Sequence, residues 1–188
     1  RGSGIGRTGP GGDPRVSGFR PGVRVGVDVG KARIGVARCD MHGMLATPVE
    51  TVLRATGDPV ARIIAIAHEL DAFELVVGLP LSMSGGETAS TADARGFAEL
   101  LSAAWHAAGG EAPVRMVDER LSTVSAHAAL RGAGRSQRSS RSIVDQVAAV
   151  VLLQHAIDTE KLTGTPMGET LQSPPTGDVA DSATAGGA

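Results

Sequence analysis

Aromatic residues are scarce in this sequence, and tyrosine is absent. Phe, Trp and Tyr together make up 2% of its 188 residues. Proteins that bind single-stranded nucleic acid without sequence preference stack the bases on aromatic side chains. The scarcity argues against such a stacking platform. Any recognition of nucleic acid would therefore use the backbone and the shape of the substrate.

Cysteine pairs, long apolar runs and excess charge are also missing. Cys39 is the only cysteine, which excludes an internal disulfide and suits a reducing compartment. No apolar run is long enough to span a bilayer and no signal-like segment opens the sequence, so we expect a cytoplasmic protein that is not bound to a membrane. The formal net charge is −2, so a surface that attracts nucleic acid has to be locally basic.

Glycine and proline are concentrated at the two ends. Residues 1–22 are rich in Gly, Pro and Arg and predict a disordered arm. Residues 163–188 are rich in Gly, Pro, Ser and Thr and predict a disordered tail. The part between them, residues 23–162, has the length of one compact domain.

This central part begins with a pattern typical of strands. Residues 23–29 and 33–38 alternate between apolar and other residues around a short turn, which predicts a hairpin. A third strand is expected within residues 44–53. Asp58 followed by Pro59 is a typical helix start, with the aspartate as N-cap.

Helices and strands then alternate. The continuous apolar run "ELVVGLP" predicts a central parallel strand, and "VRMVDER" predicts the last strand. The helices are expected over residues 89–107, 122–130 and 142–157. This order predicts an α/β fold with a mixed sheet, in which a three-strand antiparallel meander precedes parallel strands and helices cover both faces.

Acidic residues occupy special places in these elements. Asp28 interrupts the first strand, Asp118 and Glu119 end the last strand, and Asp145 lies among apolar residues of the final helix. Functional groups gather at the carboxyl ends of parallel strands, so we expect these acids to converge. Two carboxylates about 5 Å apart repel by roughly 3 kcal/mol at an effective dielectric near 20. Bound Mg²⁺ or Mn²⁺ would offset this, as in enzymes that hydrolyse phosphodiesters.

Each acid also has a purely structural explanation. Asp28 alone could sit at a strand edge or turn, and one acid of the "DER" segment could pair with Arg120. Asp145 could interact with the dipole at the start of its helix. Together these explanations require three coincidences at one end of one sheet, which favours the metal site.

Two segments could contact phosphates. "LPLSMSGGET" offers amides and hydroxyls between a strand and a helix, although it could be an ordinary connecting loop. "RGAGRSQRSSR" contains arginines and no acid, although it could be a soluble linker. Lys31 and Arg120, which follow the first and last predicted strands, are added to these segments as cations. The candidate substrate-binding residues are therefore Lys31, Ser82, Ser84, Gly85, Arg120, Arg135, Arg138 and Arg141.

Four ordered segments resemble the YqgF/RuvX family of bacterial RNase H-like nucleases. They are "VGVDVGKARIGVA", "VVGLPLSMSG", "VDERLST" and "IVDQVAAVVLLQ", and the match runs from about Val23 to Asp158. The resemblance implies an RNase H-like fold and metal-dependent cleavage of nucleic acid. Family members are described as Holliday junction resolvases or as nucleases that mature the 5′ end of pre-16S rRNA.

The family's acidic positions correspond to Asp28, the acids of "DER" and Asp145. Within "DER" we select Glu119 as the metal ligand and keep Asp118 in reserve, because strand alternation points only one of them inward. The pattern alone does not give the register that decides between them. The sequence departs from the family at Ser82, where members often carry asparagine; serine makes a shorter contact but keeps a hydroxyl.

The alternatives differ in substrate, assembly and chemistry. A junction resolvase cuts two symmetric strands and should be a two-fold homodimer, whereas an enzyme that processes precursor rRNA can be a monomer. A non-catalytic module that binds nucleic acid or ribosomes could use the same fold. A phosphotransferase of the actin and sugar-kinase type opens with a similar hairpin, but it needs a duplicated domain that this length cannot supply.

Overall fold

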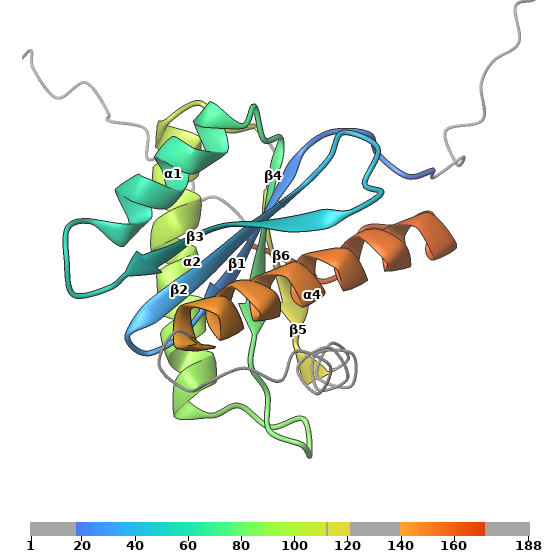
Figure 1. Cartoon of the computed structure of the whole chain (residues 1–188). Helices are drawn as coiled ribbons and strands as arrows, with labels where there is room; N and C mark the ends of the chain where they lie inside the picture. The colour runs from blue at the N-terminus through green and yellow to red at the C-terminus, as the bar shows by residue number, and fades with distance from the viewer. Residues whose placement is uncertain (1–17, 112, 121–139, 172–188) are drawn as a thin grey trace, which may run out of the picture.

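The computed structural model describes residues 18–111, 113–120 and 140–171, and for residues 140–145 it describes the backbone alone. Its centre is a sheet of six strands in the order β3-β2-β1-β4-β5-β6 (Figure 1). The elements in chain order are β1 (Arg24–Val29), β2 (Arg33–Cys39), β3 (Ala46–Leu53), α1 (Pro59–Glu69), β4 (Glu74–Leu79), α2 (Ala89–Ala107), β5 (Val114–Asp118), α4 (Ser140–Thr163) and β6 (Glu169–Leu171).

The strand directions confirm the predicted mixed sheet. β1, β2 and β3 form an antiparallel meander. β4 pairs parallel to β1, and β5 pairs parallel to β4. The carboxyl ends of β1, β4 and β5 therefore lie at one edge of the sheet, which we call the carboxyl edge.

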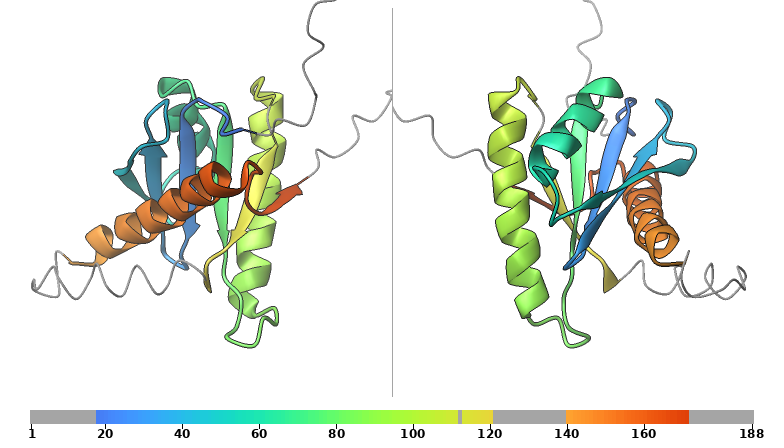
Figure 2. Two further views of the ribbon diagram at one scale, coloured as in Figure 1. Left: turned by 90° about the vertical axis from the view of Figure 1, so that its right-hand side faces the viewer. Right: turned by 60° about the vertical axis from the view of Figure 1, so that its left-hand side comes forward.

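Helices cover both faces of the sheet, as the sequence predicts. α1 and α2 lie on one face, whereas α4 crosses the other (Figure 2). Alternate residues of each strand face different helices: Val27 and Val77 belong to the core with α1 and α2, and Val76 belongs to the core with α4. This parity decides on which side each polar residue of the carboxyl edge emerges.

Asp58 begins α1 in the predicted way. Its carboxylate accepts hydrogen bonds from the amides of Val60 and Ala61 at 3.0 and 3.1 Å, and Pro59 occupies the first helical position. α2 begins with a capping box in which Thr88 and Thr91 bond each other's backbone amide. Both helices therefore start where local side-chain chemistry satisfies their free amides.

α4 runs antiparallel to β1 along the sheet. Near its end, Glu160 bonds Arg24 at the start of β1. Further back, Leu153 packs on Gly26, where an added Cβ would lie 2.8 Å from the Cβ of Leu153. Gly26 therefore lets the helix approach the sheet closely. Although α4 is 24 residues long, no helix in the described parts of the chain is apolar enough at sufficient length to cross a membrane.

Several predicted boundaries are wrong. The ordered body continues beyond residue 162, because α4 ends at Thr163 and β6 then pairs antiparallel with β5. "VRMVDER" is therefore not the last strand. β6 is held by tertiary contacts, such as the hydrogen bond from Arg115 to Thr170, and such contacts leave no periodic pattern in three residues.

The start of the body and the start of α4 also differ from expectation. The predicted arm extended to residue 22, but Arg20 is bonded to Glu160 at 2.9 Å. α4 begins at Ser140, so Arg141 lies in its first turn and not in the preceding loop. The predicted helix 122–130 lies outside the described residues, as do Arg135 and Arg138.

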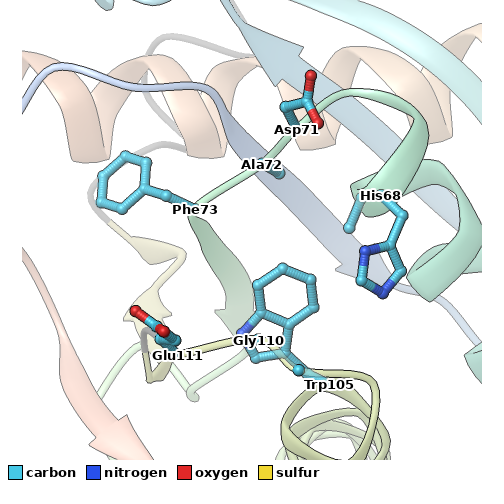
Figure 3. Close-up of a pocket in the computed structure, with 9 residues that line it drawn as sticks. His68, Asp71, Ala72, Phe73, Trp105, Gly110 and Glu111 are labelled. Atoms are coloured by element: carbon cyan, nitrogen blue, oxygen red, sulfur yellow. The ribbon is translucent and has the colours of Figure 1, made fainter.

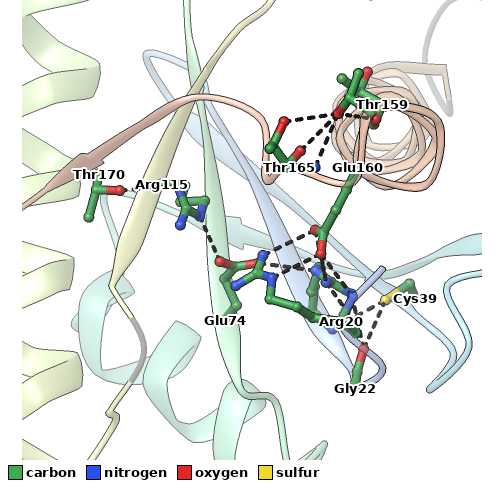
Figure 4. Close-up of polar contacts among 11 residues, drawn as sticks. Arg20, Gly22, Cys39, Glu74, Arg115, Thr159, Glu160, Thr165 and Thr170 are labelled. Carbon is green, nitrogen blue, oxygen red and sulfur yellow. Dashed lines mark hydrogen bonds and ion pairs between the residues drawn. The ribbon is translucent and has the colours of Figure 1, made fainter. Parts of the chain in front are cut away.

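A buried ionic network closes the opposite edge of the sheet (Figure 4). Arg24 donates to Glu74 at 3.0 Å and to Glu160 at 2.9 Å, and these three residues are at most 2% exposed. Arg20 and Arg115 add further bonds to Glu74 at 2.9 and 2.8 Å. The network joins the starts of three strands to the end of α4.

Candidate active site

The structure brings Asp28 and Glu119 together at the carboxyl edge. Val27 pairs with Val77, so Asp28 follows beside Gly78 of β4. Glu119 follows β5, and its amide donates to the carbonyl oxygen of Leu79 at 3.2 Å, which continues the strand pairing. The two carboxyl groups share a side-chain hydrogen bond. Strand parity places both on the face that α4 covers.

Gly78 makes room for this contact. A Cβ atom on Gly78 would overlap Oε1 of Glu119, so the carboxyl group lies directly over the glycine. Gly78 lies within β4, which continues to Leu79. An isolated glycine inside an apolar strand indicates that another group approaches the backbone. This signal was present in "ELVVGLP" and marks Gly78 as a residue that shapes the site.

Glu119 has a strongly perturbed acidity. Burial is the main cause, and the charge and hydrogen bond of Asp28 and the charge of Asp118 add to it, which raises the pKa of Glu119 to about 8. A proton shared between these two partly buried carboxyl groups removes their repulsion in the absence of a cation. Such pairs are typical of functional sites, because a divalent cation can replace the proton.

Asp118 lies on the other side of the sheet and contacts Arg120. Its Oδ2 atom accepts from Nη2 of Arg120 at 2.6 Å, and its Oδ1 atom accepts from the Arg120 amide at 2.9 Å. Hydrogen bonds from Arg120 lower the pKa of Asp118, so this carboxylate stays ionised. The described geometry therefore places Glu119 beside Asp28 and Asp118 beside an arginine.

The loop after β4 is closed by its own hydrogen bonds. The hydroxyl of Ser82 accepts from the amide of Gly86 at 2.9 Å and lies 3.1 Å from the hydroxyl of Ser84. Gly85 has a φ of +86° and lies beside Arg120. The candidate substrate-binding residues Ser82, Ser84, Gly85 and Arg120 thus lie together at the carboxyl edge.

Lys31 lies in a separate hollow of about 350 Å³ beside the start of α2. Arg54, Ser90 and Asp93 also line it, and Arg54 is held by Asp93 at 3.0 Å through Nη2. The sequence reading did not identify Arg54. Its signal was weak, because an arginine after an edge strand is usually solvated.

Asp145 is placed by the backbone of α4 alone. It lies one helical turn before Ala149, whose carbonyl oxygen is 3.2 Å from the position of an added Cβ on Gly26. Going from Ala149 to Asp145 advances about 6 Å along the helix. Because α4 is antiparallel to β1, this step leads toward the carboxyl end of β1 and Asp28.

The described donor set suits a hard divalent cation, and it is incomplete by itself. Asp28 and Glu119 offer carboxylate oxygens, which Mg²⁺ and Mn²⁺ prefer. Among the described side chains, which do not include that of Asp145, no group of three acidic, histidine or cysteine residues is arranged to hold a metal ion. The pair fits a cation that takes further ligands from Asp145, water or substrate phosphate.

A second hollow among the described residues is remote from these acids. It measures about 400 Å³ and is lined by His68, Asp71, Phe73, Trp105 and Glu111, among others (Figure 3). Phe73 directly precedes β4, so the hollow lies at the opposite edge of the sheet. Its side chains and those of the carboxyl edge cannot act on one substrate atom.

Comparison with known proteins decides the family. The family model described as RuvX, Holliday junction resolvase, matches residues 22–159. The chain belongs to the RuvX family. The match includes both described acids and α4 up to Thr159, and it confirms the resemblance seen in the sequence motifs.

Relatives of this RuvX family chain carry a nuclease name. One from Clavibacter michiganensis subsp. michiganensis, named "Putative pre-16S rRNA nuclease", is 59% identical over 152 residues, which is 80% of this chain and 91% of the relative. A protein of the same name from Leifsonia xyli subsp. xyli is 54% identical, with 82% and 97% of the two chains covered.

A solved structure confirms the RNase H-like fold. T. thermophilus RuvC in complex with a Holliday junction substrate matches with a TM-score of 0.51 and 19% identity. The match covers 77% of this chain and 99% of that one. At this identity the likeness establishes the fold alone. The activity has to be argued from the residues of the site.

Proposed function

We propose that this RuvX family chain is a metal-dependent endonuclease that hydrolyses phosphodiester bonds of structured nucleic acid. The observation that carries the proposal is the partly buried, hydrogen-bonded pair of Asp28 and Glu119 at the carboxyl edge, with the pKa of Glu119 raised to about 8. A structural ion pair would pair one carboxylate with a cation. Two carboxyl groups held together create a site that a divalent cation stabilises.

In this proposal Asp28, Glu119 and Asp145 hold Mg²⁺ or Mn²⁺. When bound, the cation supplies an activated water and stabilises the leaving oxygen of the phosphodiester. Asp28 and Glu119 bind as carboxylates, so Glu119 must release its proton as the metal enters. The course of α4 supports Asp145 as the third ligand, because it leads from Ala149 toward the end of β1.

The substrate is held by backbone contacts. The cations and hydroxyls near the carboxyl edge suit phosphates, and aromatic residues for base stacking are scarce. The names of the relatives favour precursor 16S rRNA, and the family description favours a four-way DNA junction. Either substrate fits a cytoplasmic enzyme, which would be a monomer for rRNA or a two-fold homodimer for junctions.

Cleavage by the Asp28→Asn variant tests the proposal. The purified protein is incubated with four-way junction DNA and with a precursor 16S rRNA fragment, with Mg²⁺ or Mn²⁺, and the products are mapped. We expect wild type to cut one of them and Asp28→Asn to lose at least about 100-fold in rate, since even groups behind the ligands change activity 10- to 100-fold. Substrate binding without metal should be kept.

Asp58→Asn is the matched control. It makes the same chemical change at the N-cap of α1, where asparagine caps as well as aspartate. Its cleavage rate should equal that of wild type. Wild-type binding without any metal-dependent cleavage would overturn the proposal and favour the non-catalytic binding module. Measurement of the molecular mass in solution beside the product map separates a dimeric resolvase from an rRNA nuclease.

The arginine-rich segment is tested separately, because Arg135 and Arg138 lie outside the described residues. We propose that Arg135, Arg138 and Arg141 contact phosphates. Their joint replacement by glutamine should weaken binding to every sequence alike. The slope of log affinity against log salt concentration should flatten by about 0.9 per lost contact on duplex DNA. An unchanged slope would make the segment a linker.

A further inference from the structure

The carboxylate of Asp118 holds Arg120 in one orientation. Three donors of Arg120 reach it: the backbone amide at 2.9 Å, Nε at 3.0 Å and Nη2 at 2.6 Å. The two side chains are 25% and 36% exposed, so substrate can reach the pair. The bidentate contact fixes the plane of the guanidinium group.

The loop after β4 fits this orientation of Arg120. A Cβ atom on Gly85 would lie 3.0 Å from Nη1 of Arg120, so the third nitrogen of the guanidinium group faces the backbone of the loop. Gly85 has a φ of +86°, which favours glycine independently of the arginine. The exposed hydroxyls of Ser82 and Ser84 lie in the same short loop.

Asp118 is poorly placed to bind the same cation as Asp28. Successive residues at the end of a strand emerge on opposite faces, so Asp118 emerges on the face of α1 and α2 and Glu119 on the face of α4. A cation bound by Asp118 would also have to displace Arg120. The arrangement therefore calls for another role for this acid.

This inference rests on the nuclease function proposed above. We propose that Asp118 is a positioning residue. It holds Arg120 beside Gly85 so that the guanidinium group binds a backbone phosphate of the nucleic-acid substrate. Guanidinium binds phosphate through parallel hydrogen bonds, and an orientation fixed beforehand reduces the conformational entropy lost on binding. The serine hydroxyls of the loop complete a phosphate subsite at the carboxyl edge.

Binding of junction DNA and precursor rRNA, measured without metal over a range of salt concentrations, tests the subsite. Asp118→Asn removes a negative charge, so charge alone predicts tighter binding of nucleic acid. The positioning role predicts the opposite, with a dissociation constant raised about tenfold, as for loss of one charged hydrogen bond. Arg120→Gln should raise it equally and flatten the salt slope by about 0.9 on duplex DNA.

The double variant and a control complete the experiment. If Asp118 acts through Arg120, the double variant binds no more weakly than Arg120→Gln alone. Glu50→Gln removes an acid from another exposed arginine pair, with Arg62, and should leave binding unchanged. Binding by Asp118→Asn that equals or exceeds that of wild type overturns the proposal.

Cleavage distinguishes this proposal from the nuclease proposal. If Asp118→Asn binds normally but loses both cleavage and the metal-induced rise in melting temperature, Asp118 is a metal ligand and the positioning role is wrong. If wild type binds nucleic acid through Arg120 but never cleaves it, the phosphate subsite is supported and the proposed nuclease function is wrong.

Discussion

The two ends of the interface beneath α4 use the same strands in opposite ways. At one end, β1, β4 and β5 present Arg24, Glu74 and Arg115, which form the buried ionic network with α4. Four residues later, the same strands lead to Asp28, Gly78 and Glu119. The first end holds acids and arginines, whereas the second brings two carboxyl groups over a glycine.

The acidities show what this difference means. Burial acts to raise the pKa of Glu160, but hydrogen bonds and charges from Arg20 and Arg24 outweigh it, and the pKa is lowered. Burial also acts on Glu119, but there Asp28 and Asp118 reinforce it, and the pKa rises to about 8. At the ionic end, arginines of the chain neutralise the carboxylates. At the acidic end, the charge of Asp28 and Glu119 is best neutralised by a proton or a cation.

The largest effect on stability is expected at the ionic end. Arg24→Met removes the most buried arginine of the network and leaves Glu74 and Glu160 with the more exposed Arg20 and Arg115 as partners. Breaking a buried pair costs about 3–5 kcal/mol. Urea denaturation at pH 7 measures the free energy of unfolding. Arg62→Met, at an exposed ion pair, serves as the control and should change little. A small loss for Arg24→Met would mean that the network is dispensable.

The response to metal should distinguish the acidic end. If the metal site is present, Mg²⁺ or Mn²⁺ at about 100 times its dissociation constant should stabilise wild type by roughly 2.7 kcal/mol and raise its melting temperature. Asp145→Asn should reduce the stabilisation by metal, and it should leave the melting temperature without metal unchanged or raise it. Arg141, four residues earlier in α4, could instead pair with Asp145 as helix neighbours do. In that case Asp145→Asn and Arg141→Gln would both lower the metal-free melting temperature and leave the metal response intact.

The two ends should also respond oppositely to pH in metal-free protein. The folded state keeps a proton on Glu119 that the unfolded state loses near its ordinary pKa of 4.5, so stability falls as pH rises from about 4.5 to about 8. The lowered pKa of Glu160 gives the reverse trend, with stability lost as pH falls below 4.5. Glu119→Gln should remove only the first trend, which thermal unfolding between pH 4 and 9 detects.

The smallest effect on stability is expected for Gly78→Ala. The added methyl group displaces only the end of the flexible Glu119 side chain, and replacing a strand glycine reduces unfolded-state entropy, so stability should change by less than about 1 kcal/mol. The metal response should nevertheless weaken. Gly96→Ala on α2, where an added Cβ meets nothing within 4 Å, is the control and should leave the response unchanged. A normal metal response in Gly78→Ala would show that Glu119 is not a metal ligand.

Much of the fold could be predicted from the sequence, because its signals are local. Alternation in the first strands, Asp58 before Pro59 and the apolar run of β4 each depend on a few neighbouring residues, and the structure confirms them. The four family motifs likewise depend only on local order. β6 could not be predicted, because its three residues are held by pairing with β5 and not by a pattern of their own.

The sequence by itself determined which acids were candidates and that only one of Asp118 and Glu119 could face Asp28. Only the tertiary structure decided that Glu119 lies beside Asp28 and that Asp118 holds Arg120. The reason is that β1 and β5 lie about ninety residues apart in the chain, and their relative register is set through β4, which lies between them. The raised pKa of Glu119 follows from that register, because burial and neighbouring charge exist only after the strands are packed.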